Sequence, residues 1–117
     1  MSINRAFIAG NLTRDAELRR TNSDTPVLVF CTAFNDDIKN DQGEWVERPN
    51  YIDCSLYGKR AEAIAERMKK GVKVSLEGKL RWSQWEKCGQ RRSKIELIVT
   101  EIEFMKQAEE RDHHETQ

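Results

Sequence analysis

The stretch that decides the fold is residues 50–80, NYIDCSLYGKRAEAIAERMKKGVKVSLEGKL. Its first part, 50–57, alternates apolar and polar side chains and predicts a strand with one buried face. Its middle part, 59–70, repeats apolar residues at helical spacing and is followed by a glycine, which predicts a helix. The apolar stripe of this helix consists of Ala61, Ile64, Ala65 and Met68. Its last part, 72–76, alternates again, and Gly78 predicts a bulge or a bend in that strand.

Further strands are expected on both sides of this stretch. Apolar and β-branched residues predict strands over 3–12, 27–35 and 94–105. The polar segments 36–43 and 86–90 each contain a glycine and are interpreted as hairpin loops. Five strands with one helix between the third and the fourth is the order of an OB-fold barrel, so the sequence predicts an all-β chain of that fold.

Length and composition predict one domain with a short tail. The chain has 117 residues, which suits a single domain. Residues 107–117 contain only Ala108 as an apolar residue and are expected to form a disordered acidic tail after a domain that spans 1–106. The sequence has no apolar run long enough to span a membrane and no apolar stretch typical of a signal peptide at its start, so a cytoplasmic protein with no membrane contact is expected.

Histidine and cysteine usage argues against most catalytic and metal chemistry. Both histidines, His113 and His114, lie in the expected tail. The three cysteines, Cys31, Cys54 and Cys88, are far apart and lack the spacing of a zinc site. We therefore expect no enzymatic activity, no cofactor and no metal, with free thiols in a reducing compartment.

The charge is segregated along the chain although it sums to zero. Residues 59–94 carry 12 basic and 4 acidic side chains, a net charge of +8. Such a segment is a candidate phosphate-binding surface. The alternative interpretation is an ordinary solvated face with mixed charges.

Several aromatic residues share a strand face with polar side chains. Tyr51 and Tyr57 alternate in phase with Asp53 and Ser55, and Trp85 has the parity of Lys79 and Arg81. Aromatic rings on a basic, wet face suit single-stranded nucleic acid, because bases stack on the rings while Lys and Arg hold the phosphates.

The other aromatic residues are harder to assign. Trp82 has the parity of Leu80, so either packing or DNA contact is expected, and Trp45 near the long loop is similar. Phe7, Phe30 and Phe104 are expected in the core.

Three motifs carry a resemblance to a known family. They are NLTRDAELR at 11–19, YGKRAE at 57–62 and KGxxVxxEGxL at 70–80. In this order and spacing they resemble bacterial-type single-stranded DNA-binding proteins, and the resemblance covers about 3–105. It implies an OB fold, sequence-independent binding of single-stranded DNA in replication, recombination or repair, and a homotetramer. The stacking positions that it implies are Tyr51, Tyr57 and Trp85, and the basic contacts are Arg5, Arg19, Lys59, Lys70, Arg81 and Arg92; Trp45, Trp82 and Lys79 complete the expected DNA-binding set.

Three departures from the family pattern stand out. Ala16 occupies a position where proline is usual, and the two tyrosines stand where tryptophan or phenylalanine is common. The acidic, hydrophobic-tipped peptide that often recruits replication and repair proteins is absent from the end, His113 to Gln117. This departure points to a phage, plasmid or specialised paralogue, or to a trimmed chain. It also keeps a second function open, that of a primosome-like OB accessory protein acting mainly through protein contacts.

Self-association is expected from the strand patterns as well. Large apolar residues occupy both faces of the first, second and last strands, and Val27, Val29 and Cys31 alternate with Leu28 and Phe30. Only one of these two sets can face the interior of a single barrel. The other set would be exposed to solvent, so a homo-oligomer is predicted.

Overall fold

The computed structural model describes residues 2–105. The expected tail at 107–117 lies outside the described residues, so the domain boundary at 106 stays a prediction. In chain order the elements are β1 (Ala6–Leu12), β2 (Glu17–Arg20), β3 (Pro26–Lys39), β4 (Trp45–Tyr57), α1 (Lys59–Ile64), the 3-10 helix η1 (Ala65–Arg67), β5 (Lys73–Lys87) and β6 (Gln90–Met105).

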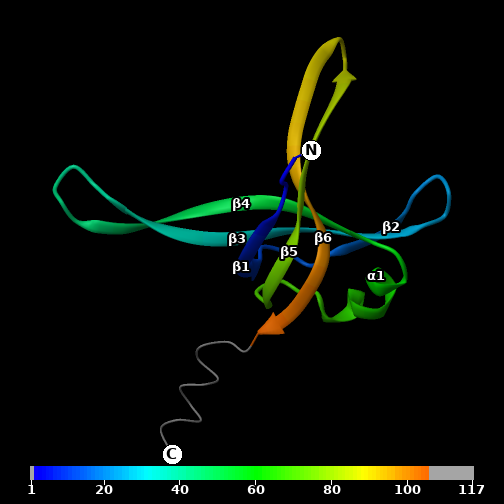
Figure 1. Ribbon diagram of the computed structural model, residues 1–117, viewed down its shortest axis with the longest axis horizontal. Helices are drawn as coiled ribbons and strands as arrows, with labels where there is room; N and C mark the ends of the chain where they lie inside the picture. The colour runs from blue at the N-terminus through cyan, green and yellow to red at the C-terminus, as the bar shows by residue number, and fades with distance from the viewer. Residues whose placement is uncertain (1, 106–117) are drawn as a thin grey trace, which may run out of the picture.

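Five of these strands close into a barrel. The strand order is β1-β5-β6-β4-β3, and β1 also pairs with β3, which joins the two ends. The barrel pairings are antiparallel except β4 with β6, which is parallel. Helix α1 lies between the third and fourth barrel strands along the chain, so the expected OB-fold order is confirmed. Two long hairpins, β3–β4 and β5–β6, project from the barrel in different directions (Figure 1).

Both hairpins are longer than the sequence predicted. The expected loop at 36–43 was wrong in its first half, because β3 continues to Lys39 and only 40–44 lie outside the strands. An apolar register pair, Ile38 with Val46, and an ion pair between Asp36 and Arg48 hold the extension together. The expected loop at 86–90 shrinks to Cys88 and Gly89, which both have positive φ angles, of 54° and 77°. Positive φ at both central residues is the requirement of a tight type I′ hairpin turn.

The helix is shorter than predicted, and a short strand was missed. Helical structure ends at Arg67 rather than Lys70. The reason is that Met68 is fully buried and its carbonyl accepts the N–H of Ala16, which turns the chain inward before a further helical turn can form. The missed strand, β2, pairs Glu17–Arg20 with the start of β3; four consecutive exposed residues give it no alternation to recognise.

The core fills the barrel from all of its strands. Its largest buried side chains are Leu12, Leu28, Phe30, Leu56, Met68, Leu76 and Leu97. Phe30 is therefore core as predicted, and Phe104 is half-buried against that core with the guanidinium of Arg67 3.8 Å from its ring. Phe7 was predicted wrongly: it is 73% exposed, because its neighbour Ile8 pairs with Leu76 on the inner side and leaves Phe7 on the outer side.

The bulge expected at Gly78 is present, with the extra residue on the partner strand. Glu77 pairs with Glu101 and Gly78 with Val99, so Thr100 of β6 is the inserted residue and β5 keeps its alternation. A Cβ on Gly78 would lie 2.2 Å from the carbonyl oxygen of Ile98. Glycine is required here because the two backbones approach too closely for any side chain.

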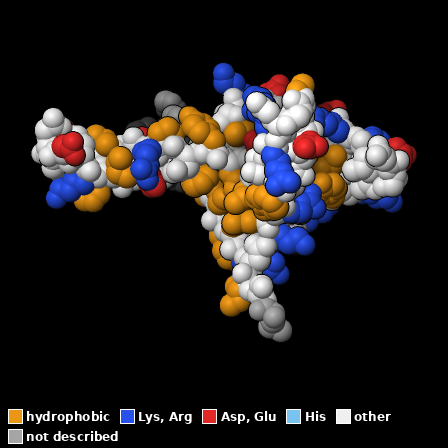
Figure 2. Space-filling view, turned by 90° about the horizontal axis from the view of Figure 1, so that it is seen from above, with side chains coloured by type: hydrophobic (Ala, Val, Ile, Leu, Met, Phe, Trp, Pro, Cys, Tyr) orange, Lys and Arg blue, Asp and Glu red, His pale blue; other side chains and the backbone are white. Residues whose placement is uncertain are grey.

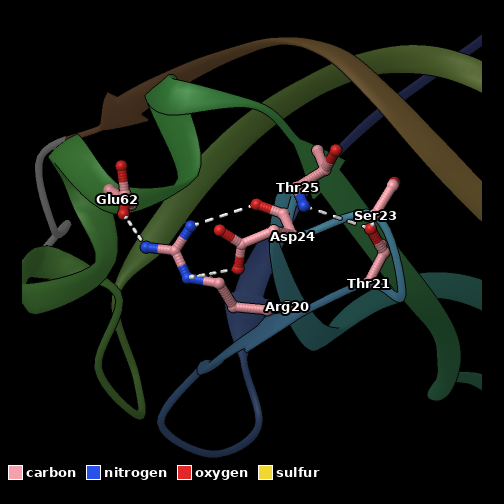
Figure 3. Close-up of polar contacts among 6 residues, drawn as sticks. All are labelled: Arg20, Thr21, Ser23, Asp24, Thr25 and Glu62. Atoms are coloured by element: carbon pink, nitrogen blue, oxygen red, sulfur yellow. Dashed lines mark hydrogen bonds and ion pairs between the residues drawn. The ribbon is translucent and has the colours of Figure 1, made fainter.

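Surface ion pairs tie the helix to the barrel at two points. Arg20 of β2 bonds Glu62 of α1 and also reaches Asp24 in the β2–β3 turn (Figure 3). Arg60 donates to the carbonyl of Thr100 at 2.7 Å on the other side. Exposed pairs of this kind contribute little stability individually, but together they orient α1 over the end of the barrel.

Candidate nucleic-acid interface

One face of the sheet collects most of the residues singled out from the sequence. Side chains of register partners lie on the same side of a sheet. Asp53 of β4 pairs with Glu96 of β6, which pairs with Arg81 of β5, so alternate residues of all three strands share the outside of the barrel. We call this surface the outer face; its members used below are Tyr51, Ser55, Tyr57, Lys79, Arg81, Trp85, Arg92, Lys94 and Glu96.

The three expected stacking residues are all exposed on the outer face. Tyr51 and Tyr57 come from β4, and Trp85 comes from β5, near the turn of the β5–β6 hairpin. Trp85 stands opposite Arg92 in the register. The rings therefore extend from the barrel wall out along the hairpin, with basic side chains between them.

The basic residues divide into those on the outer face and those elsewhere. Lys79, Arg81 and Arg92 lie on it. Arg5 precedes β1, whose first residue pairs with Gly78, so Arg5 stands opposite Lys79. Arg19 of β2 reaches the edge of the same face, because it pairs with Val27, which pairs with Tyr57.

Lys59 and Lys70 do not join this set. Lys59 is the first residue of α1, and Lys70 follows η1, so both flank the helical segment rather than the three strands. The backbone N–H of Lys70 bonds the carboxylate of Asp15, which fixes that turn. The expected DNA contacts of these two lysines stay predictions.

A polar network crosses the outer face beneath Tyr57. Arg81 donates a hydrogen bond to the Tyr57 hydroxyl at 3.0 Å, and its guanidinium carbon lies 5.8 Å from the centre of that ring. Another contact of the same nitrogen is Glu96, 3.7 Å away. The Ser55 hydroxyl donates to the other carboxylate oxygen of Glu96 at 2.8 Å. Ser55 and Glu96 are buried, although the sequence placed Ser55 on a wet face.

Trp82 lies on the opposite side of the hairpin from Trp85. It pairs with Ile95 and shares its side with Leu80, as its parity predicted. Trp82 does not pack onto the barrel within the described chain, because it is 59% exposed, against 43% for Trp85. Packing at an interface and contact with DNA both stay predictions. Beyond Arg81 and Glu96 the hairpin pairs with no other strand among the described residues and projects from the barrel (Figure 1), so its inner side is not covered there. On the face of the molecule seen from above, hydrophobic side chains lie at the surface beside Lys and Arg (Figure 2).

Trp45 stands apart from the other rings. It begins β4 at the far end of the β3–β4 hairpin, is exposed, and has Lys39 5.9 Å from its ring centre. It has the parity of Tyr51, six positions away along the strand.

Sequence reasoning missed two members of the outer face. Lys94 pairs with Ser83 and Glu96 pairs with Arg81, so both lie beside the predicted residues. Alternation from Arg92 through Lys94 to Glu96 was the available signal. It was missed because the last strand was expected to begin at 94, so Arg92 was not counted in the same alternation.

Residues 2–105 bring together no group of three or more potential metal-binding side chains. No helix in that range is long and apolar enough to cross a membrane.

Comparison with known proteins gives the family. The Single-strand binding protein family matches residues 3–105. The chain belongs to this family. A single-stranded DNA-binding protein of Treponema pallidum is 39% identical over 103 residues, which are 88% of this chain and 58% of the relative. That of Aquifex aeolicus is 39% identical over 103 residues, 88% of this chain and 70% of the relative.

Solved structures agree with the fold. A deletion mutant of the single-stranded DNA binding protein from Thermus aquaticus superposes with a TM-score of 0.80 at 28% identity, over 91% of this chain and 52% of that one. A Plasmodium falciparum SSB in complex with single-stranded DNA has a TM-score of 0.81 at 18% identity, over 91% and 97% of the two chains. The chain thus spans little more than half of the Treponema and Thermus proteins, and it matches them through the barrel.

Proposed function

We propose that this protein binds single-stranded DNA without sequence preference and keeps it protected and accessible during replication, recombination or repair. The observation that carries the proposal is the outer face, where Tyr51, Tyr57 and Trp85 are exposed among basic side chains. Each stacked base gains about 1–3 kcal/mol, and every base has a ring face, so this mode of binding tolerates any sequence. The relatives named single-stranded DNA-binding protein support the same function.

The proposed contacts follow the geometry. Lys79, Arg92 and Lys94 supply phosphate contacts along the β5–β6 hairpin, with Arg5 beside Lys79. The hairpin segment 79–94 has six basic side chains and one acidic one. A polyanion is thus attracted to this arm although the whole chain is neutral. No bond is made or broken in this function, so we propose a binding protein rather than an enzyme.

We also propose that the protein acts as a homo-oligomer, as a tetramer. Ile3, Phe7, Leu80, Trp82 and Ile95 are exposed large apolar side chains within the described chain. The strand pattern also suggested Val27 and Cys31 for such an interface. They support it less well, because both are already buried in the single chain. Light scattering at micromolar concentration checks the assembly, and a monomer mass would contradict it.

The test of function is a fluorescence titration with oligo(dT), duplex DNA and an RNA oligomer of equal length. We expect quenching and the tightest binding with oligo(dT), and binding that weakens as salt rises. The logarithmic slope for single strands is about −0.7 per neutralised phosphate. Equal affinity for duplex, or binding that is independent of salt, would refute the proposal.

A further inference from the structure

Arg81 is held from two sides on the outer face. Its terminal nitrogen donates to the Tyr57 hydroxyl at 3.0 Å and lies 3.7 Å from Glu96. The Arg81 side chain is 47% exposed, whereas that of Glu96 is only 11% exposed. Glu96 is in turn anchored by Ser55 at 2.8 Å. A half-exposed cation is therefore fixed at its charged end by a buried carboxylate.

The buried carboxylate changes what Arg81 can do. A carboxylate out of water is unfavourable unless a cation or hydrogen-bond donors compensate it. Within residues 2–105 the ion pair recorded for Glu96 is the one with Arg81, so this guanidinium is its compensating charge. Its charge is already offset before any phosphate arrives. Lys79, two residues earlier on the same face, has no ion pair among the described residues.

The hydroxyl bond acts on the ring of Tyr57. A tyrosine on an open sheet face otherwise samples several side-chain orientations, and ordering such a side chain on binding costs about 0.5–1.5 kcal/mol. The bond to Arg81 holds the phenol by its tip, while 41% of Tyr57 stays exposed to solvent. The Tyr57 ring is therefore already oriented when a base reaches it.

We infer that Arg81 is a positioning residue for Tyr57, locked in place by Glu96 and Ser55, and that it is not one of the phosphate-binding cations. The inference rests on the proposed function and narrows it, because it removes Arg81 from the expected set of phosphate contacts. It assigns Glu96 a role in a face that otherwise favours positive charge.

The experiment measures the affinity for oligo(dT) at several salt concentrations in Lys79→Gln, in Tyr57→Phe and in a double variant that carries Arg81→Gln and Glu96→Gln. Lys79→Gln is the matched control, and its slope should become shallower by about 0.7. The double variant removes the neutral pair as a whole, so it should weaken binding about 2- to 10-fold at every salt concentration with an unchanged slope. In the Tyr57→Phe background, which lacks the hydroxyl, the same two substitutions should have little further effect on the affinity.

Glu96→Gln should change the salt slope in the direction opposite to Lys79→Gln, and it tests whether Glu96 anchors Arg81. It keeps an acceptor for Ser55 but frees the charge of Arg81, so the salt slope should become steeper. Thermal unfolding of each variant checks that the barrel is intact. A slope that becomes shallower in the double variant as in Lys79→Gln would overturn the positioning role, and an unchanged slope in Glu96→Gln would overturn the anchor. No binding of oligo(dT) by the unaltered protein would instead refute the proposed function.

Discussion

Two tryptophans three residues apart on one hairpin give the sharpest test of the binding face. Trp85 lies on the outer face opposite Arg92, and Trp82 lies on the other side opposite Ile95. If Trp85 stacks on one base, Trp85→Ala should cost about 1–3 kcal/mol of binding free energy, which is about a 5- to 150-fold loss of affinity. Trp82→Ala should lower the affinity less than twofold, since its ring faces away from the basic side chains.

Both changes should leave the barrel intact. Trp82 is among the apolar side chains proposed for the homo-oligomer, so light scattering checks that Trp82→Ala keeps the same assembly, and with the assembly unchanged the pair is a matched control. The two rings are 43% and 59% exposed, so neither is a core side chain. Each substitution should cost at most about 1.5 kcal/mol of unfolding free energy, because full burial of a large apolar side chain is worth about 1.5–3 kcal/mol. The assay is a fluorescence titration with oligo(dT), with thermal unfolding alongside. An equal loss of affinity in the two variants would show that the outer face alone does not define the site.

Three further predictions concern the fold. Gly78→Ala should destabilise the protein by about 1–3 kcal/mol in denaturant unfolding, because the new Cβ would meet the Ile98 carbonyl at 2.2 Å. Cys88→Asn should raise the melting temperature slightly, because asparagine tolerates the φ of 54° at this turn better than cysteine does; a lower temperature would contradict the turn assignment. Burial raises the pKa of the Cys54 thiol to about 12. The unfolded chain therefore loses this proton first, stability should fall as pH rises from 9.0 toward 12, and Cys54→Ala should remove that part of the slope.

The fold was predictable because its deciding signals are local. Alternation over 50–57 and 72–76, the helical stripe and the glycine at 78 each fix one element and its inner side. The ends of the hairpins were not predictable in the same way. Asp36, Asp37 and Lys39 are exposed and polar, and a single apolar residue, Ile38, gives this segment too little alternation to predict a strand. It pairs because the β3–β4 ladder continues through it and places Ile38 opposite Val46.

The candidate site was likewise predictable where its signal is local and not where it depends on the pairing of distant strands. Tyr51, Tyr57 and Trp85 were found because parity alone places a side chain on one face or the other. The network of Ser55, Glu96 and Arg81 was not found, since it depends on the parallel pairing of β4 with β6, which joins residues 41 positions apart. The misplacement of Phe7 has a similar cause: only the register with β5 shows which of Phe7 and Ile8 turns inward.

Trp45 tests how far the binding surface extends along the second hairpin. Residues 36–48 carry five acidic side chains and two basic ones, a net charge of −3, so this arm repels phosphate while the β5–β6 arm attracts it. Trp45 is six residues, or about 20 Å, along the strand from Tyr51, which exceeds a Debye length of about 8 Å at physiological salt. The attraction of the basic arm is therefore screened before it reaches this ring. We expect Trp45→Ala to reduce the affinity for oligo(dT) less than Trp85→Ala does, and the gap between the two variants to widen at low salt, where repulsion by the acidic arm reaches further. Equal losses at all salt concentrations would mean that the strand passes along both hairpins despite their opposite charge.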